Sequence, residues 1–127
     1  MSELKVIGKR SRSEDGLEKV TGKARYIADY AVPGMLMAKV LRSPVPHAWI
    51  RELDVTPALQ VPGVVAVATA DDFVDHGLWG WPIKDAYALA WRKVRYVGDG
   101  VAVVAAESEA AALAGIRAIR VAYEPLP

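Results

Sequence analysis

Apolar positions along this chain recur mainly with the period of strands. Residues 48–55 alternate as a strand with one partly wet face does. One predicted face holds Trp49, Arg51, Leu53 and Val55, and the other holds Ile50, Glu52 and Asp54. Residues 35–41 and 101–106 are largely apolar and predict buried strands. Further strands are predicted at residues 24–27, 64–69 and 119–123.

Two short helices are predicted between these strands. Thr56 caps the first, Pro57 takes its first helical position, and the Pro-Gly pair at residues 62–63 ends it. Ser108 caps the second, with Glu109 favourably placed in its first turn. The buried stripe of this second helix is predicted to be Ala112, Leu113 and Ile116.

The order of these elements predicts an α+β fold with two loosely similar halves, each of the β-β-α-β type. Residues 1–18 are polar and predict an extended lead-in on the surface, so the domain itself is expected at residues 19–127. Between the halves lies an irregular stretch, residues 72–92, with three of the chain's 4 tryptophans. Long irregular segments inside a domain are uncommon and are often functional.

Composition removes several classes of function. The 16 basic and 15 acidic residues give a net charge of +1, so no basic field favours nucleic acid. The chain has no cysteine, which excludes disulfides, thiolate zinc sites, iron–sulfur clusters and a cysteine nucleophile. No stretch approaches the roughly 20 apolar residues of a membrane span. We therefore expect a cytoplasmic protein with neither nucleic acid nor membrane as partner.

Candidate catalytic groups do not combine into a site. His47 lies in a proline-bounded turn, and His76 has no histidine or carboxylate at metal-ligand spacing. Asp71 or Asp72 is well suited to begin a short helix, and this role is favoured over an acid–base pair. The Gly98-Asp99-Gly100 run precedes a strand instead of opening a helix, so it predicts a tight turn with positive φ angles and no dinucleotide site.

The aromatic run in the irregular stretch can be interpreted in two ways. Tryptophans beside Gly and Pro commonly line a pocket or an interface, and ordinary core packing is about as good an explanation. The candidate residues are Leu78, Trp79, Trp81, Pro82 and Ile83.

Four segments in fixed order resemble a known family. They are KVTGKARYIAD (19–29), LRSPVPHAWI (41–50), KVRYVGDGVAVVAAES (93–108) and VAYEPLP (121–127). Together they resemble the N-terminal α/β-hammerhead domain of the molybdopterin-binding large subunit of the xanthine dehydrogenase and aldehyde oxidase family. The residues that match its motifs, for which a structural role is expected, are Arg42, Ser43, Pro44, His47, Gly98 and Asp99, whereas Gly100 stands where the family usually has proline.

The resemblance implies a mixed β-sheet with two or three helices, and a domain of an oxidoreductase that hydroxylates its substrate. The domain would wall part of the substrate channel with the aromatic run and pack against a downstream cofactor-binding domain. The parent enzyme would hold a molybdopterin–molybdenum cofactor, with iron–sulfur clusters and FAD on partner subunits. This chain would hold none of them and would be inactive alone.

From the same resemblance we expect an expressed fragment or a truncated reading frame of a bacterial-type large subunit, which self-associates when isolated. The alternative is a free-standing module with the same fold that binds a small molecule or a protein.

Overall fold

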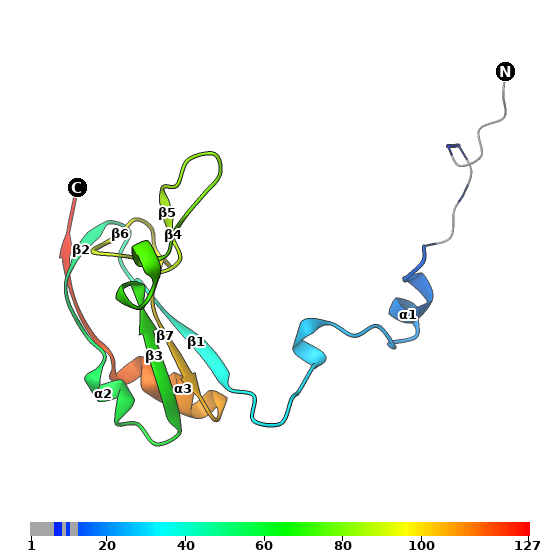
Figure 1. Ribbon diagram of the computed structural model, residues 1–127, viewed down its shortest axis with the longest axis horizontal. Helices are drawn as coiled ribbons and strands as arrows, with labels where there is room; N and C mark the ends of the chain where they lie inside the picture. Colours follow the sequence, from blue (N-terminus) through cyan, green and yellow to red (C-terminus); the bar gives the residue numbers. More distant parts are fainter. Residues whose placement is uncertain (1–6, 9, 11–12) are drawn as a thin grey trace. The chain divides into compact units, whose positions relative to one another are not determined.

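The computed structural model describes residues 7–8, 10 and 13–127, which fall into two units, Met1–Pro33 and Gly34–Pro127. The first unit contains helix α1 (Gly16–Val20) and the 3-10 turn η1 (Ile27–Asp29) (Figure 1). The strand predicted at residues 24–27 is therefore wrong. The Asp29 carboxylate accepts a hydrogen bond of 2.9 Å from the backbone N–H of Tyr26, and this local bond favours a turn over an extended chain.

In the second unit, β7 (Gly100–Ala106) is the middle strand of a three-stranded antiparallel sheet. Its neighbours are β1 (Met37–Arg42) and β3 (Val64–Thr69). Both faces of β7 are largely buried, and its residues are accordingly apolar throughout. Val101, Ala102, Val104 and Ala106 are fully buried. The three predicted strands of this sheet are confirmed as strands. The burial expected for residues 35–41 is not found, because Met37 and Val40 on the edge strand β1 are 44% and 37% exposed.

A second antiparallel sheet has the order β6-β2-β8, with β6 at Lys93–Val94, β2 at Ala48–Asp54 and β8 at Arg120–Pro125. Ile50 is opposite Tyr123 and Glu52 is opposite Ala122, so Arg51 is the extra residue of a β-bulge. A bulge reverses the side on which the later residues lie. Leu53 therefore packs on the core together with Ile50, and the predicted grouping of Leu53 with Trp49 and Arg51 is wrong.

Helix α2 (Thr56–Leu59) begins one residue earlier than predicted. Val55 is its N-cap, and the Asp54 carboxylate accepts a hydrogen bond of 2.9 Å from the N–H of Thr56. Helix α3 (Glu109–Ala118) is capped as predicted, because the Ser108 hydroxyl accepts a hydrogen bond of 3.2 Å from the N–H of Ala111.

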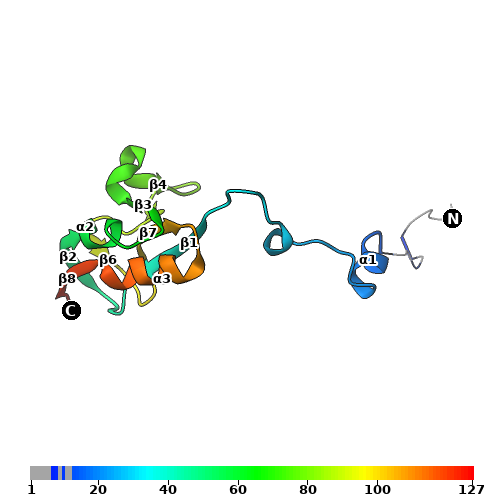
Figure 2. The same ribbon diagram turned by 90° about the horizontal axis from the view of Figure 1, so that it is seen from below.

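The buried stripe of α3 is only partly as predicted. Ala112 and Gly115 are buried, whereas Leu113 is 39% exposed. Gly115 lies so near β7 that a Cβ placed on it would be 2.8 Å from a methyl group of Val104. Small residues thus let the helix pack closely on β1 and β7, with α2 beside it (Figure 2).

The two halves of the fold interlock. The first half is β1-β2-α2-β3 and the second is β6-β7-α3-β8. The outer strands of each half flank the second strand of the other, in the orders β1-β7-β3 and β6-β2-β8. The α+β hammerhead prediction is confirmed, but the strands pair antiparallel in three sheets where one mixed sheet was expected.

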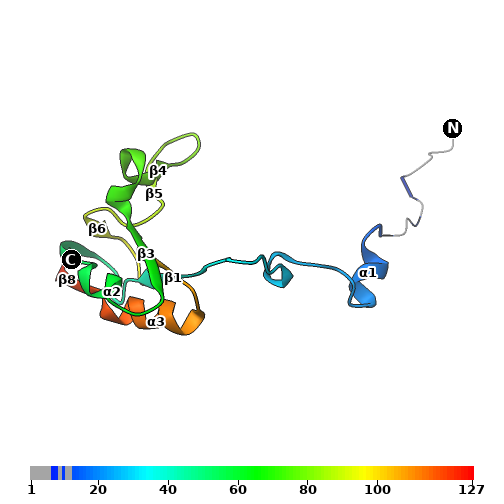
Figure 3. The ribbon, with the colours of Figure 1, turned by 60° about the horizontal axis from the view of Figure 1, so that its bottom comes forward.

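The third sheet is a hairpin of β4 (Leu78–Trp79) and β5 (Ala86–Tyr87). It follows two 3-10 turns, η2 (Ala70–Asp72) and η3 (Val74–Gly77). Its loop extends away from the other sheets of the unit and from α2 and α3 (Figure 3). Most of the irregular stretch thus forms a projection on one side of the domain.

Candidate functional site

The two motifs expected to be structural lie against each other. The N–H of Ser43 donates to the carbonyl of Asp99 at 2.8 Å, and the N–H of Gly98 donates to the carbonyl of Ser43 at 2.8 Å. The Arg42 guanidinium donates to the carbonyl of Gly98 at 2.9 Å. Gly98 has a φ of 93°, so the positive φ predicted for this turn is found there.

The polar side chains of this junction are buried and hydrogen-bonded. Ser43 is 2% and Asp99 9% exposed. The Ser43 hydroxyl donates to the carbonyl of Val45 at 2.8 Å, and the Asp99 carboxylate accepts from the N–H of Arg95 at 3.1 Å. Burial raises the pKa of the Tyr123 phenol, a hydrogen bond with Ser43 opposes this shift, and the charge of Asp99 adds to it.

The other motif residues lie at the borders of the same junction. His47 Nδ1 is 2.9 Å from the carbonyl oxygen of Pro127, and the N–H of Leu126 donates to the carbonyl of His47 at 2.9 Å. Gly100 faces Val40, whose methyl group would lie 3.2 Å from an added Cβ. Pro44 is exposed. These contacts hold loops together, and the structural role of the motif stays a prediction.

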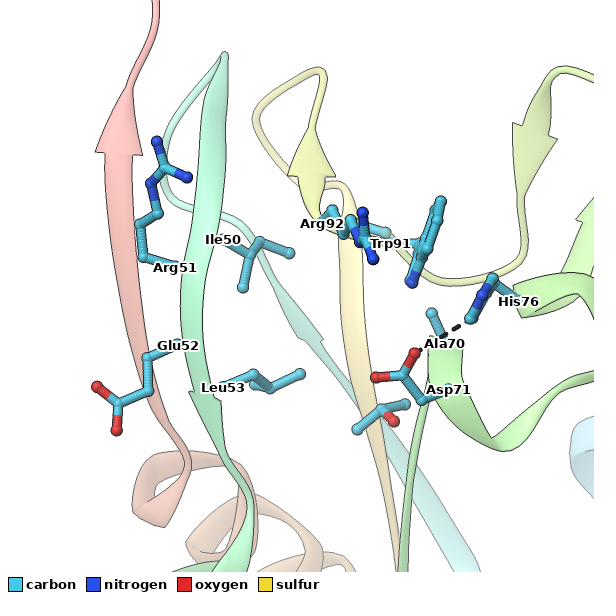
Figure 4. Close-up of a pocket in the computed structure, with 11 residues that line it drawn as sticks. Ile50, Arg51, Glu52, Leu53, Ala70, Asp71, His76, Trp91 and Arg92 are labelled. Carbon is cyan, nitrogen blue, oxygen red and sulfur yellow. Dashed lines mark ion pairs between the residues drawn. The ribbon is translucent and has the colours of Figure 1, made fainter.

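A separate pocket of about 370 Å3 lies where strand β2 faces the turns η2 and η3 (Figure 4). Apolar side chains of β2 form one wall, and the opposite wall comes from η2, η3 and the segment before β6. Its lining residues are Ile50, Arg51, Glu52, Leu53, Thr69, Ala70, Asp71, His76, Ala90, Trp91 and Arg92.

Trp91 is the central side chain of this pocket. Its ring stacks on the imidazole of His76, with centroids 4.0 Å apart and planes 13° apart. The guanidinium carbon of Arg92 lies 4.4 Å from the centre of the Trp91 ring, and Figure 4 shows the indole between the side chains of Arg92 and His76. Asp75, His76 and Arg92 have φ angles of 51°, 54° and 59°. Left-handed backbone at residues other than glycine is costly and gathers at functional sites.

Asp71 and His76 face each other across the pocket edge (Figure 4). His76 Nδ1 lies 3.2 Å from a carboxylate oxygen of Asp71. The contact lacks hydrogen-bond geometry, and this buried nitrogen has no hydrogen-bond partner in the described part of the chain. The Thr69 hydroxyl donates to Asp72 at 3.0 Å, in the capping box at the start of η2. The pocket has space for a ligand, and among the residues described here no hydroxyl in it is paired with a histidine base.

Asp71 or Asp72 was expected to begin a short helix, but neither residue does so. Thr69 is the N-cap of η2, and Asp72 accepts a hydrogen bond of 2.6 Å from the N–H of Thr69. Asp72 thus reaches back from the third position of the turn instead of beginning it. Asp71 contacts His76, five residues further on.

The aromatic candidates lie on the hairpin instead of in this pocket. Trp79, Trp81 and Ile83 are 62%, 95% and 70% exposed, and Leu78 is half-buried. Trp91 was not among the residues expected from the sequence, although it belongs to the same aromatic stretch. In the sequence, Trp91 could have been singled out because it lies between Ala90 and the basic residues Arg92, Lys93 and Arg95.

Among the residues described here, no three His, Asp or Glu side chains converge in the way that metal ligation requires. Over the same described residues, no helix has the length and apolar character needed to cross a membrane.

Comparison with known proteins shows which family has this sequence and fold. A model of the family described as "Aldehyde oxidase and xanthine dehydrogenase, a/b hammerhead domain" matches residues 21–127. A probable xanthine dehydrogenase subunit of Bacillus subtilis (strain 168) is 44% identical over 122 residues, which are 95% of this chain and 16% of that protein. The "Nicotinate dehydrogenase large molybdopterin subunit" of Eubacterium barkeri is 42% identical over 124 residues, 98% of this chain and 29% of the relative.

Solved structures of related enzymes superpose on this chain. The CO dehydrogenase from Oligotropha carboxidovorans superposes with a TM-score of 0.82 at 38% identity, over 94% of this chain and 15% of that one. The quinoline 2-oxidoreductase from Pseudomonas putida 86 gives a TM-score of 0.79 at 37% identity, over 90% of this chain and 16% of the other. The chain thus spans less than a third of the length of each of these relatives. With the sequence motifs, the interlocked sheets and the family match in agreement, this chain belongs to the aldehyde oxidase and xanthine dehydrogenase family, as its a/b hammerhead domain.

Proposed function

We propose that this chain serves within a larger molybdenum hydroxylase subunit, where it packs against the cofactor-binding part and walls part of the substrate channel. It is not catalytic alone. The observation that carries this proposal is the β4–β5 hairpin, which presents Trp79, Trp81 and Ile83 largely to solvent. Exposed large aromatic side chains on a projecting loop are typical of a surface that another part of an assembly covers.

The relatives' names support the assignment of the cofactor to the remainder of such a subunit. One relative is called a large molybdopterin subunit, and this chain matches 29% of its length. The molybdopterin–molybdenum group would be held by the part that this chain does not span, and iron–sulfur clusters and FAD by partner subunits. The isolated chain would then self-associate through the uncovered hairpin.

A domain exchange tests the proposal. Residues 21–127 would replace the matching segment of the Bacillus subtilis relative, and the hybrid would be purified with its partner subunits and assayed for xanthine oxidation. In the hybrid, Trp79→Ser with Trp81→Ser raises KM at unchanged assembly if the hairpin walls the channel. The same pair of changes prevents assembly if the hairpin is a packing surface. Leu59→Ser, at an apolar side chain 48% exposed on α2, is the control and changes neither property.

The alternative function, a free-standing binding module, predicts different behaviour. A free-standing binding protein would stay monomeric in analytical ultracentrifugation and would bind a small molecule tightly, with quenching of the fluorescence of Trp79 and Trp81. A hybrid that never assembles, together with that behaviour of the isolated chain, would overturn the proposed role.

A further inference from the structure

The two faces of the sheet β1-β7-β3 are covered unequally. Val104 and Ala106 of β7 are fully buried on the side where α3 packs (Figure 2). Helix α2 lies on this side too, because its Ala58 belongs to the same buried cluster as Val104. Val103 and Ala105 alternate with the buried pair and therefore face the other side of the sheet, where each is only part-buried.

The residues that the strand register places on this second side are apolar. We call them the open face: Ala38, Val40, Ala66, Ala68, Val103 and Ala105. Solvent-facing sides of antiparallel sheets usually carry polar residues. Lys39 of β1 lies instead on the covered side, where it pairs with Glu109 at the start of α3. Val40 is 37% exposed, and Val65, at a bulge beside Ala66, is 53% exposed. An apolar patch of this kind marks a surface that another structure covers.

The chain itself shows which kind of side chain the open face accepts. Leu89, in the segment before β6, is only 5% exposed. A Cβ added to Gly100 would lie 3.4 Å from a methyl group of Leu89 and 3.2 Å from one of Val40, so Leu89 covers the end of the open face beside Gly100. The N–H of Ala90 donates to the carbonyl of Gly100 at 2.6 Å and holds the segment there. The rest of the face is lined mainly by alanine, which leaves room for the large aliphatic side chains of an occupant.

We propose that the open face is the docking site for an apolar segment of the larger subunit, which presents leucine-type side chains to it as Leu89 does. The inference rests on the proposed place of this chain within such a subunit. The chain matches 16% of the Bacillus subtilis relative, so most of such a subunit lies outside it and can supply the segment. Alanine and valine side chains offer no hydrogen-bonding group or charge, so a polar or charged segment would lose its hydration there without compensation.

The first test measures whether the face is open in the isolated chain and covered in the subunit. Because the chain has no cysteine, Ala66→Cys introduces a single thiol whose rate of alkylation reports its exposure. Ala114→Cys, at an exposed position of α3, is the control. In the isolated chain the two thiols should react within about threefold of each other. In the hybrid with the Bacillus subtilis relative, mass spectrometry of the labelled peptides should show a rate at least about tenfold lower for Ala66→Cys and an unchanged rate for Ala114→Cys.

A pair of charged substitutions separates docking from folding. Ala38→Glu with Ala66→Glu should leave the isolated chain as resistant to urea as the control pair does, because both positions are exposed. The same pair should prevent assembly of the hybrid, because two carboxylates would be buried against an apolar segment. Ala110→Glu with Ala114→Glu is the matched control, since it adds equal charge at exposed positions of α3, and its hybrid should assemble.

The outcomes distinguish this inference from the role proposed for the hairpin. If the glutamate pair on the open face prevents assembly while Trp79→Ser with Trp81→Ser changes nothing, the docking site stands and the role of the hairpin fails. If the tryptophan variants behave as proposed but the glutamate pair assembles, the docking site alone is overturned. Slow alkylation of Ala66→Cys in the isolated chain also overturns it, because the chain would then cover the face itself. An unchanged hybrid that does not assemble overturns it as well, because the docking site requires the larger subunit.

Discussion

The backbone N–H of Ser43 donates a hydrogen bond of 2.8 Å to the carbonyl of Asp99, which joins two motifs far apart in the sequence. Both side chains are buried, and each bonds the backbone of its own loop, Ser43 at Val45 and Asp99 at Arg95. The junction fixes the turn between β6 and β7 against the end of β1. Its contribution to stability can be measured directly.

Asp99→Ala should lower the free energy of unfolding by about 1–3 kcal/mol, because it leaves the N–H of Arg95 without its acceptor in a part-buried place. Asp99→Asn keeps an oxygen acceptor and should lose less. Urea denaturation of the two variants and the unchanged chain measures the difference. Equal stability of all three would mean that water satisfies the Arg95 N–H and that the side chain does not hold the turn.

Gly115→Ala should destabilise the domain even though alanine favours helices. The new methyl group would lie 2.8 Å from Val104 and 3.0 Å from Val64, and overpacking of this kind costs about 1–3 kcal/mol. Helix propensity returns about 1 kcal/mol of that cost. Ala114→Gly, at the exposed neighbouring position, measures the propensity alone. A rise in the midpoint of thermal unfolding for Gly115→Ala would contradict the close packing of α3 on β7.

Ser108→Ala should cost about 1 kcal/mol of stability, because the hydroxyl accepts the hydrogen bond from the N–H of Ala111 at the start of α3. Ser108→Asp preserves an acceptor and places a negative charge at the helix N-terminus, so it should unfold at nearly the same urea concentration as the unchanged chain. The cap is unimportant if the alanine and aspartate variants unfold together at that concentration.

Tyr123 should make stability depend on pH in the alkaline range. Its pKa in the folded chain is raised above the ordinary value of 10.0 by burial. At a pH above 10.0 the phenol therefore ionises more readily in the unfolded chain, which favours unfolding. The stability is fully present below that value and falls as the pH rises through the folded-state pKa.

Urea denaturation between pH 8 and pH 11, at roughly half-unit steps, measures this effect. Tyr123→Phe removes the ionisable group and should flatten the decline, although other tyrosines keep part of it. The same decline in both proteins would show that Tyr123 ionises alike in the folded and unfolded chains.

Much of the fold is present in local sequence patterns. The apolar run of β7, the Ser108 cap of α3 and the positive φ of Gly98 each depend on a few neighbouring residues, so periodicity and residue chemistry predict them. The family resemblance rested on such local motifs as well. Errors occurred where a single inserted residue changes the register, as at Arg51, where the bulge turns Leu53 to the core.

The candidate site depended on tertiary structure. Asp71, His76 and Trp91 have no regular spacing, and only the packing of the turns before the hairpin against the segment before β6 brings them to one pocket. The pairing of each half's outer strands with the middle strand of the other half is likewise invisible in local patterns. Sequence by itself thus determined the longer strands and the helices α2 and α3, because those preferences are local. Tertiary structure decided which strands pair and which side chains meet, because those contacts join residues far apart along the chain.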